Sequence, residues 1–135
     1  MITMVSLFTK IVQGKIPAYK VAEDGEHLAF LDIYPAAEGH TLVIPKKETD
    51  YLFDLSDEDY LKLQAFAKKA AIGLKKAIPC KKIGVIVLGL EVPHAHIHLV
   101  PMQSEADLLN FSNKLKLTPE KFQEIAAKIS SEIKL

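Results

Sequence analysis

Residues 94–100, which read His-Ala-His-Ile-His-Leu-Val, place three imidazoles at every second position, with apolar side chains between them. In an extended strand, alternate side chains point to opposite faces of the sheet. We therefore expect the three histidines to share one face, while Ala95, Ile97 and Leu99 turn into a core. A helix would scatter positions i, i+2 and i+4 around its axis and would form no such row.

Four interpretations of this histidine row compete. The first is that three surface histidines fall in register by chance. A metal site is the second, but the outer two rings would lie about 13 Å apart on a straight strand, while zinc–nitrogen bonds are about 2.0–2.1 Å. Residues 92–101 also contain no Asp or Glu. The third, a serine hydrolase, needs a G-x-S-x-G turn, which the chain lacks. The fourth is a histidine that is itself a nucleophile, with neighbours that move protons and bind an anion.

The same seven residues match, at every position, the signature of the histidine triad (HIT) family, His-x-His-x-His-x-x with apolar x. The similarity continues through residues 7–12, 15–18, 28–33 and 39–47. The chain thus resembles the HINT-like branch of the family, whose members are small enzymes that hydrolyse nucleoside 5′-phosphoramidates and related nucleotidyl esters. This resemblance implies a HIT-like fold and a purine nucleotide or nucleoside phosphoramidate as substrate.

The chain length predicts one compact domain, and the resemblance implies that residues 1–135 form a single HIT domain. Hydrophobic residues make up 49% of the chain and charged residues 25%, which excludes a disordered protein. The formal net charge is zero, so no overall field favours nucleic acid or a membrane surface as partner. The single cysteine, Cys80, cannot form an internal disulfide, which indicates a reducing compartment. No basic segment followed by a long apolar run precedes Lys10, so we expect a cytoplasmic protein.

Periodicity and turn residues predict an α+β fold with an antiparallel sheet of about five strands. Expected strands cover residues 21–23, 28–32, 40–44, 82–88 and 95–100. The nearly continuous apolar run at 82–88 favours a central strand buried on both faces. A short helix is expected at 6–13, one long central helix at 56–77 and a C-terminal helix from Thr118, where Thr and Pro form a typical N-terminus. Residues 103–116 are expected to form a loop that contacts a partner subunit.

Chemistry and resemblance together assign the catalytic residues. His96 lies at the centre of the row, and the resemblance places the nucleophile there. A neutral imidazole suits attack on an anionic phosphorus centre, and a phospho-histidine is a good leaving group in the second step. His98 would bind a phosphoryl oxygen, while His94 and His40 would support the tautomer of His96. Taken alone, His40 would be read as a surface or capping residue.

Asp32 follows an expected strand, where an isolated Asp is usually a turn residue. A carboxylate can also accept hydrogen bonds from two ribose hydroxyls, and the resemblance implies that role for Asp32. Five apolar residues that would be assigned to the core by default line a slot for the base by resemblance: Leu7, Phe8, Ile11, Phe30 and Ile33.

The loop before the histidine row departs from the family pattern. Residues 88–93 are shorter than usual, although Gly89 matches. Glu91 stands where a small hydroxyl residue often assists the leaving group. A carboxylate 4 Å from a phosphate would be repelled by about 1–4 kcal/mol, depending on the local dielectric. We therefore expect Glu91 to point away, to bind a cationic amine or to offer only its backbone N–H.

A second departure concerns metal. Many bacterial members carry Cys-x-x-Cys near the start and a histidine after Pro-Lys-Lys, which contribute to a structural zinc site. The corresponding positions here are Ser6, Thr9 and Glu48. Because hydroxyls replace thiolates poorly as zinc ligands, we expect no metal and no cofactor.

Three functions stay open at this point. The first is a nucleotidyl hydrolase or transferase that forms a covalent nucleotidyl-histidine. The second is a nucleotide-binding module with little turnover, and the third is a dinucleoside polyphosphate hydrolase, since related folds act on such substrates. The resemblance also implies a homodimer, and the apolar run 83–88 would suit a two-fold contact at a sheet edge.

Overall fold

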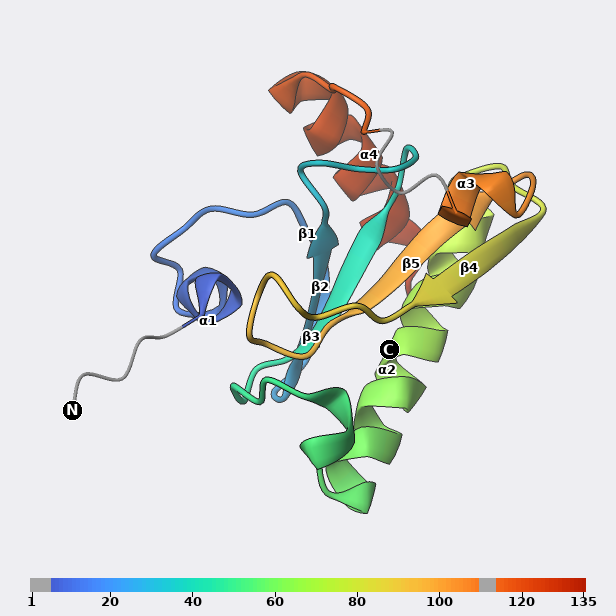
Figure 1. The fold of residues 1–135 in the computed structure, drawn as a ribbon. Helices are drawn as coiled ribbons and strands as arrows, with labels where there is room; N and C mark the ends of the chain where they lie inside the picture. The colour runs from blue at the N-terminus through green and yellow to red at the C-terminus, as the bar shows by residue number, and fades with distance from the viewer. Residues whose placement is uncertain (1–5, 110–113) are drawn as a thin grey trace.

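A five-stranded antiparallel sheet forms the centre of the computed structural model, which describes residues 6–109 and 114–135 (Figure 1). Within these residues the strands are β1 (Lys20–Glu23), β2 (His27–Leu31), β3 (Thr41–Pro45), β4 (Lys82–Ile86) and β5 (Ile97–Met102). The helices are α1 (Leu7–Val12), α2 (Asp57–Ala77), α3 (Ala106–Leu109) and α4 (Pro119–Glu132), with a 3-10 turn η1 (Leu52–Asp54). The predicted α+β class is confirmed.

The spatial order of the strands is β1-β2-β3-β5-β4. The first three strands follow one another as in the chain, and β5 then lies between β3 and β4. In its pairing with β3, His98 lies opposite Leu42, and Leu99 lies opposite Thr41. The last strand in the chain is therefore an inner strand, and the histidine row reaches the middle of the sheet.

The long helix and the C-terminal helix begin where their capping residues predict. Ser56 accepts a hydrogen bond from the backbone N–H of Asp59, and three acidic residues at 57–59 favour the positive end of α2. Thr118 accepts from the N–H of Lys121, and Pro119 occupies the first turn of α4. The expected helix over 56–77 is confirmed at both ends.

The prediction of a central strand at 82–88 is wrong. β4 ends at Ile86 and is an edge strand, with Lys82 and Val85 exposed. Val85 keeps 58% of its surface accessible to solvent. The apolar run led to the wrong prediction because hydrophobicity alone does not show how a strand is covered. A strand buried on both faces and an edge strand with exposed apolar side chains have similar sequences.

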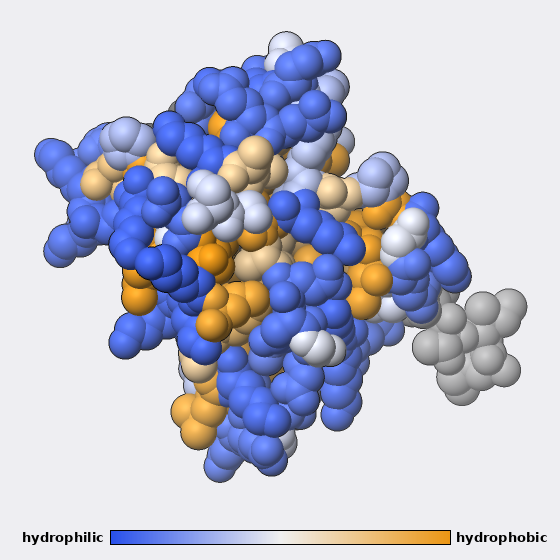
Figure 2. All heavy atoms as spheres, turned by 180° about the vertical axis from the view of Figure 1, so that it is seen from behind, coloured by the Kyte–Doolittle hydropathy of each residue, from blue (hydrophilic) through white to orange (hydrophobic). Residues whose placement is uncertain are grey.

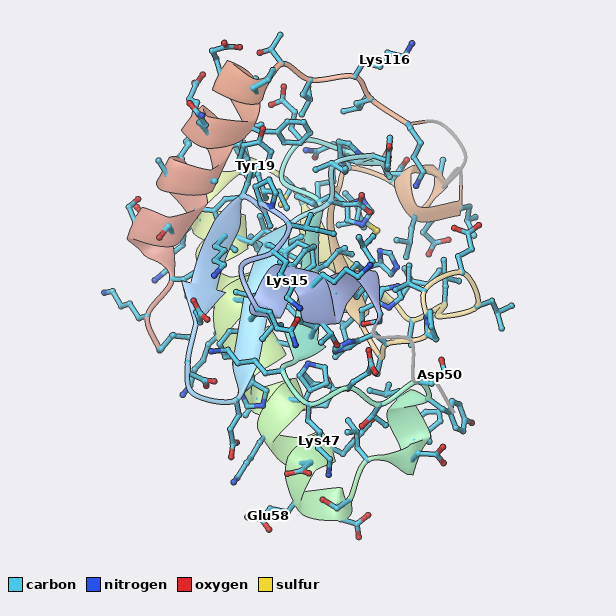
Figure 3. All side chains as sticks on the ribbon, turned by 90° about the vertical axis from the view of Figure 1, so that its left-hand side faces the viewer. Lys15, Tyr19, Lys47, Asp50, Glu58 and Lys116 are labelled. Atoms are coloured by element: carbon cyan, nitrogen blue, oxygen red, sulfur yellow. The ribbon has the colours of Figure 1, made fainter. Side chains whose placement is uncertain are left out.

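The two faces of the sheet bury different residues. One face packs on α2 and α4, and its core includes Ile97 and Leu99 of β5. The other face is covered by α1, whose buried Phe8 and Ile11 contact a smaller cluster that includes Leu42 (Figure 3). Since β5 alternates and His98 lies opposite Leu42, His98 belongs to this second face. The predicted opposition of histidines and core residues is confirmed within β5.

Most of the surface seen from behind is hydrophilic, with apolar patches near its middle (Figure 2). Over the described ranges, 6–109 and 114–135, no helix is both long and apolar enough to span a membrane.

Gly39 closes the loop that brings His40 to the start of β3. Its φ of +88° lies in the left-handed region, which side chains with a Cβ rarely adopt. An added Cβ would lie 2.9 Å from Cγ1 of Ile78 and 3.2 Å from Cδ1 of Leu74. Backbone conformation and packing therefore both require glycine at this position.

The substitution Gly39→Ala should lower the free energy of unfolding by about 1–3 kcal/mol, because strain in φ adds to a steric clash with α2. Gly25→Ala is the matched control, since Gly25 is exposed and an added Cβ there meets no atom within 4 Å. Urea titrations of both variants measure the difference. Equal stability of the two would contradict this account of Gly39.

Candidate active site at the histidine row

His96 is held in one tautomer by the backbone. Its Nδ1 lies 2.7 Å from the carbonyl oxygen of His94. A carbonyl only accepts hydrogen bonds, so Nδ1 carries the proton and donates it. In the neutral ring the lone pair then resides on Nε2. The ring is largely buried, and the edge-on ring of Phe8 lies against it with centroids 5.0 Å apart. In that neutral tautomer, Nε2 of His96 is the nitrogen without a proton.

His98 is held in the complementary state by a chain of two hydrogen bonds. The backbone N–H of Ala36 donates to Nδ1 of His40 over 3.0 Å. In a neutral ring the proton of His40 is then on Nε2, which lies 2.9 Å from Nδ1 of His98 and donates to it. This leaves the proton of His98 on its Nε2. Nε2 of His98 is therefore a hydrogen-bond donor, whereas Nε2 of His96 carries a lone pair.

Burial keeps both rings of this chain neutral. Loss of hydration lowers the pKa of His40 to about 3, and the charges of His98 and Lys114 act in the same direction. Burial likewise lowers the pKa of His98 to about 3, with further contributions from His96 and Lys114. Neutral rings are required for the tautomers just described, so the environment and the hydrogen bonds agree.

The support of His96 differs from the prediction, which gave that role to the imidazoles of His94 and His40. The His94 ring points elsewhere: its Nε2 lies 2.7 Å from the carbonyl oxygen of Pro45, and its Nδ1 lies 2.8 Å from Oγ of Ser6. His94 acts on His96 through its main-chain carbonyl instead. His40 contacts His98. The structure brings both residues close to the row, but through contacts that the sequence did not predict.

Asp32 lies beside this chain of histidines. Its Oδ1 accepts a hydrogen bond from the N–H of Tyr34 over 2.8 Å, as in an ordinary Asx turn. Its Oδ2 is 3.6 Å from Nε2 of His40. Burial raises the pKa of the Asp32 carboxyl. Both interpretations of Asp32 thus have support, since one oxygen shapes the turn and the other faces the site.

Donor atoms of Asp32, His40 and His98 lie within 4.8 Å of one another, a spacing that could hold a metal ion. The hydrogen bond from Ala36 argues against that use. A neutral histidine that binds metal through Nε2 carries its proton on Nδ1 and donates it to a second group. Nδ1 of His40 instead accepts from a backbone N–H. The cluster is better described as a hydrogen-bonded chain.

The predicted base-binding residues fall into two groups. Phe8, Ile11 and Phe30 are buried in the cluster beneath α1, and the rings of Phe8 and Phe30 meet edge to face at 5.5 Å. Leu7 and Ile33 are about half exposed, at 48% and 53%. The first group forms a fixed wall behind the histidines, while the second group offers apolar surface to a ligand.

The loop before the histidine row borders a hollow of about 550 Å³. Gly89, with φ at +83°, and Pro93 line one side of it, and Tyr51 and Phe53 around η1 line another. Glu91 is exposed on the same loop. Pro93, which precedes His94 in the chain, lines this hollow, but the three histidines of the row do not.

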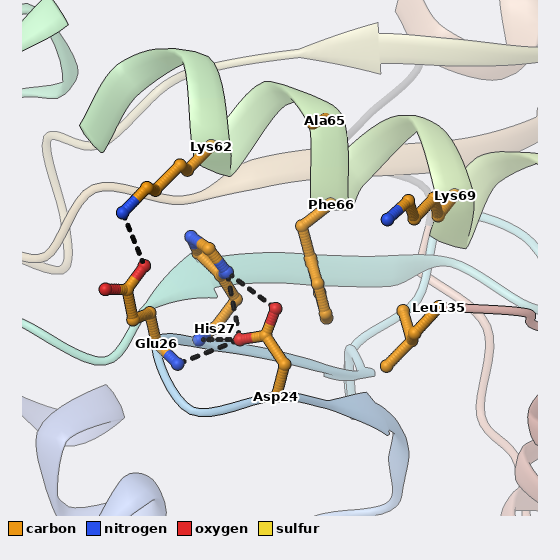
Figure 4. A pocket seen from close by; sticks show the side chains of 8 residues that line it. All are labelled: Asp24, Glu26, His27, Lys62, Ala65, Phe66, Lys69 and Leu135. Carbon is orange, nitrogen blue, oxygen red and sulfur yellow. Dashed lines mark hydrogen bonds and ion pairs between the residues drawn. The ribbon is translucent and has the colours of Figure 1, made fainter. Parts of the chain in front are cut away.

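The remaining histidine, His27, belongs to a different depression, between the β1–β2 turn and α2 (Figure 4). Oδ1 of Asp24 accepts from the N–H groups of Glu26 and His27, and Nδ1 of His27 lies 3.0 Å from the same oxygen. The His27 ring stacks on Phe66 at 5.1 Å. These contacts close a turn and pack it on α2, so His27 has a structural role.

Several contributors were not identified from the sequence. Ala36 and Pro45 act through main-chain atoms, which residue identity does not encode. Lys114 is near enough for its charge to act on His40, His98 and Asp32. Its segment is placed by a hydrogen bond of 2.8 Å from the N–H of Leu115 to the carbonyl of Pro35. The segment 103–116, predicted as a loop for a partner, thus contains α3 and this contact, while 110–113 lie outside the described residues.

The chain is similar to known proteins over most of its length. The family model for the HIT domain matches residues 13–105. An adenosine 5′-monophosphoramidase of Schizosaccharomyces pombe is 37% identical over 134 residues, which cover 97% of this chain and all of that protein. The chain therefore belongs to the HIT family.

Solved structures of HIT family proteins have a similar fold. A Hit-like protein of Bartonella henselae superposes with a TM-score of 0.82 at 32% identity, covering 94% of this chain and 95% of that one. A zinc-bound histidine triad family protein of Mycobacterium smegmatis superposes with a TM-score of 0.79 at 28% identity, covering 94% and 91%. The predicted HIT-like fold is confirmed.

The buried neutral histidines should make the protein less stable in acid. Unfolded histidines take up protons near pH 6.5, whereas His40 and His98 resist protonation until about pH 3 in the folded state. Their stabilising effect is complete above pH 6.5 and is lost as the pH falls towards 3, by up to about 1.4 kcal/mol per pH unit for each ring. The raised pKa of Asp32 offsets part of this loss.

Urea titrations between about pH 7 and pH 4 measure this dependence. The variant His40→Asn removes one titrating ring and keeps groups that can accept from Ala36 and donate to His98, so its stability should fall less steeply. Identical slopes for the two proteins would contradict the assignment of a neutral, buried His40.

Proposed function

We propose that this protein is a nucleotide hydrolase or transferase that acts on nucleoside 5′-phosphoramidates and related nucleotidyl esters, with His96 as the covalent nucleophile. The observation that carries the proposal is the pair of opposite tautomers on neighbouring rings. His96 bears a lone pair at Nε2 and His98 bears a proton at Nε2, and the two ring centroids are 4.9 Å apart. An attacking atom and a donor for the phosphoryl oxygen are thus adjacent.

The first chemical step is a displacement at phosphorus. Nε2 of His96 attacks, a nitrogen–phosphorus bond forms, and the bond from phosphorus to the departing amine breaks while the amine takes up a proton from water. The N–H of His98 stabilises the negative charge on a phosphoryl oxygen. The Nδ1–H bond to the carbonyl of His94 stabilises the positive charge that develops on His96.

The second step releases the nucleotide. Water attacks phosphorus, its oxygen bonds to phosphorus, and the bond to Nε2 of His96 breaks, which restores the neutral ring; the proton that the attacking water loses neutralises the hydroxide left by the first step. A positively charged phospho-imidazole is a good leaving group, so this step is easier than direct attack of water on the amidate. Two moderate barriers replace one high barrier.

Nucleotide recognition follows from the neighbouring residues. Asp32 accepts hydrogen bonds from the ribose hydroxyls through Oδ2, because its Oδ1 is already used by Tyr34. The base lies against the apolar surface of Leu7 and Ile33, which the buried Phe8 and Phe30 support from behind. Stacking and apolar contact bind a base with little discrimination, so we infer that a purine is accommodated. The activity named for the fission yeast relative supports this class of substrate.

Replacing His96 with Ala should abolish turnover of an adenosine phosphoramidate, by at least about a thousandfold in kcat, because no other group can take its place. Nucleotide binding, measured by calorimetry with the monophosphate, should persist through Asp32 and the apolar wall. His98→Ala should lose less activity, since it removes a donor and leaves the nucleophile.

Mass spectrometry of a rapidly quenched reaction tests the covalent step itself. The unmodified protein should gain the mass of one nucleoside monophosphate on the peptide that contains residues 94–100. Substantial activity in His96→Ala, or a wild-type reaction that never shows the adduct, would reject the nucleophile and favour a binding module with little turnover.

We also propose that the protein is a cytoplasmic homodimer. β4 is an edge strand, and Val85, Val87 and Leu88 on or just after it are exposed. An edge with exposed apolar side chains is suited to pairing with a second copy across a two-fold axis. The single Cys80 fits the reducing interior of a cell.

Light scattering at micromolar concentration should therefore report twice the 15.0 kDa chain mass. Val85→Glu should convert the protein to monomers, because a carboxylate would be buried in the new sheet. Lys20→Glu, which changes charge on the opposite edge strand β1, is the matched control and should remain dimeric. A monomeric wild type would refute the dimer.

A further inference from the structure

Four side chains from three separate segments converge beside the histidine row. Ser6 and Thr9 lie at the start of α1, Glu48 lies in the loop after β3, and His94 lies in the loop before β5. Oγ of Ser6 is 2.8 Å from Nδ1 of His94, although 88 residues separate them. Oγ1 of Thr9 is 2.8 Å from Oε1 of Glu48, 39 residues away. Contacts between such distant segments fix how α1 sits on the site.

The direction of each hydrogen bond in this cluster can be assigned. Nε2 of His94 faces the carbonyl of Pro45 at 2.7 Å and must donate to it. In the neutral ring, Nδ1 is then an acceptor, so the hydroxyl of Ser6 donates to it. Burial lowers the pKa of His94, which favours this neutral form. Ser6 accepts in turn from the N–H of Thr9 over 3.0 Å, as the cap of α1.

Glu48 completes the cluster from outside. One oxygen of its carboxylate accepts both the N–H of Ser6 and the hydroxyl of Thr9. These hydrogen bonds lower the pKa of Glu48, so it is ionised at neutral pH. A carboxylate at this point also favours the positive end of α1. The carboxylate of Glu48 is therefore hydrogen-bonded to Ser6 and Thr9, and Ser6 is in turn hydrogen-bonded to the ring of His94.

This set of groups does not fit a zinc ion. Zinc in proteins is bound by thiolate sulfur, imidazole nitrogen or carboxylate oxygen, and two of these four side chains are neutral hydroxyls. Both hydroxyls are already hydrogen-bonded, Ser6 to His94 and Thr9 to Glu48, and the two hydroxyl oxygens lie 3.1 Å apart. A metal ion would need to replace these bonds without gaining a full set of ligands. Hydrogen bonds alone account for how His94 is held.

The cluster is connected to His96 through one residue, His94. The ring of His94 is fully buried and fixed at both nitrogens. Its carbonyl oxygen, two bonds from Cα, accepts the Nδ1–H of His96 at 2.7 Å. Because the ring is bonded to Ser6 and to the carbonyl of Pro45, it anchors residue 94, and loss of these bonds would let the backbone there move together with the carbonyl that assigns the proton of His96.

We propose that Ser6, Thr9 and Glu48 are positioning residues, which hold His94 without metal and so keep Nε2 of His96 unprotonated and aimed at phosphorus. The catalytic part of this inference rests on the proposed function, in which His96 is the nucleophile.

Paired substitutions test the role of the cluster. Glu48 is exposed, so Glu48→Ala should fold, and loss of its acceptor should lower kcat about three- to tenfold with KM within about twofold. Glu48→Gln retains a carbonyl oxygen that accepts both bonds and should restore most of kcat. Ser6→Ala should lower kcat at least as much as Glu48→Ala. Lys47→Ala, an exposed neighbour, should leave kcat unchanged.

The tautomer of His96 provides a readout that does not depend on catalysis. Long-range ¹⁵N–¹H spectra of the imidazoles should show one protonated Nδ1 for His96 in the wild type and in Glu48→Gln. In Ser6→Ala and Glu48→Ala the spectra should show a mixture of tautomers. A role limited to anchoring α1 would lower Tm in these variants but leave kcat and the tautomer unchanged, and this result would overturn the proposal.

Chelation tests the claim that His94 is held without a metal ion. Dialysis against EDTA should leave Tm, the His96 spectrum and kcat unchanged, and elemental analysis should find zinc far below one per chain. About one zinc per chain, with loss of Tm on its removal, would overturn the proposal. Failure of the proposed function would look different, since the adduct on residues 94–100 would then be missing while the His96 tautomer still responded to Ser6→Ala.

Discussion

The position of one proton on each imidazole is the constraint on which this site depends. A neutral ring can attack or donate at a given nitrogen only when its proton has been assigned to the proper atom. Main-chain groups make that assignment here: the carbonyl of His94 for His96, and the N–H of Ala36 for His40 and through it His98. Main-chain groups do not titrate and have no rotamers, so the tautomers change only where the backbone that carries these groups moves.

The sheet separates stabilisation from chemistry by using its two faces differently. On β5, Ile97 and Leu99 enter the core against α2 and α4, while His98 faces the side covered by α1. Burying imidazoles is costly unless their polar atoms are paired. Among the described residues, no buried side-chain nitrogen or oxygen lacks a hydrogen-bond partner. Apolar burial on one face of the strand thus stabilises the polar row carried by the other.

Much of this arrangement could be predicted from the sequence, since it follows from local pattern. The period of two in residues 94–100 predicted the face of His98, although β5 begins only at Ile97 and His94 and His96 precede it; the caps at Ser56 and Thr118 predicted two helix starts. The position of β4 could not be predicted, because an apolar run does not show whether a strand has neighbours on both sides. The partners of His40 and His94 were also missed, since main-chain atoms of Ala36 and Pro45 supply them.

The strand order β3-β5-β4 has a consequence for how the molecule becomes active. β1, β2 and β3 can pair as they emerge from the ribosome, but β3 and β4 each keep an open edge until β5 has been synthesised. The strand that joins the two parts of the sheet also carries His98 to His40, 58 residues earlier in the chain. Closure of the sheet and assembly of the reactive pair are therefore one cooperative event. Under the proposed function, a chain that has not completed this event lacks the paired histidines, so a weakened β5 would reduce the number of working molecules rather than the speed of each one.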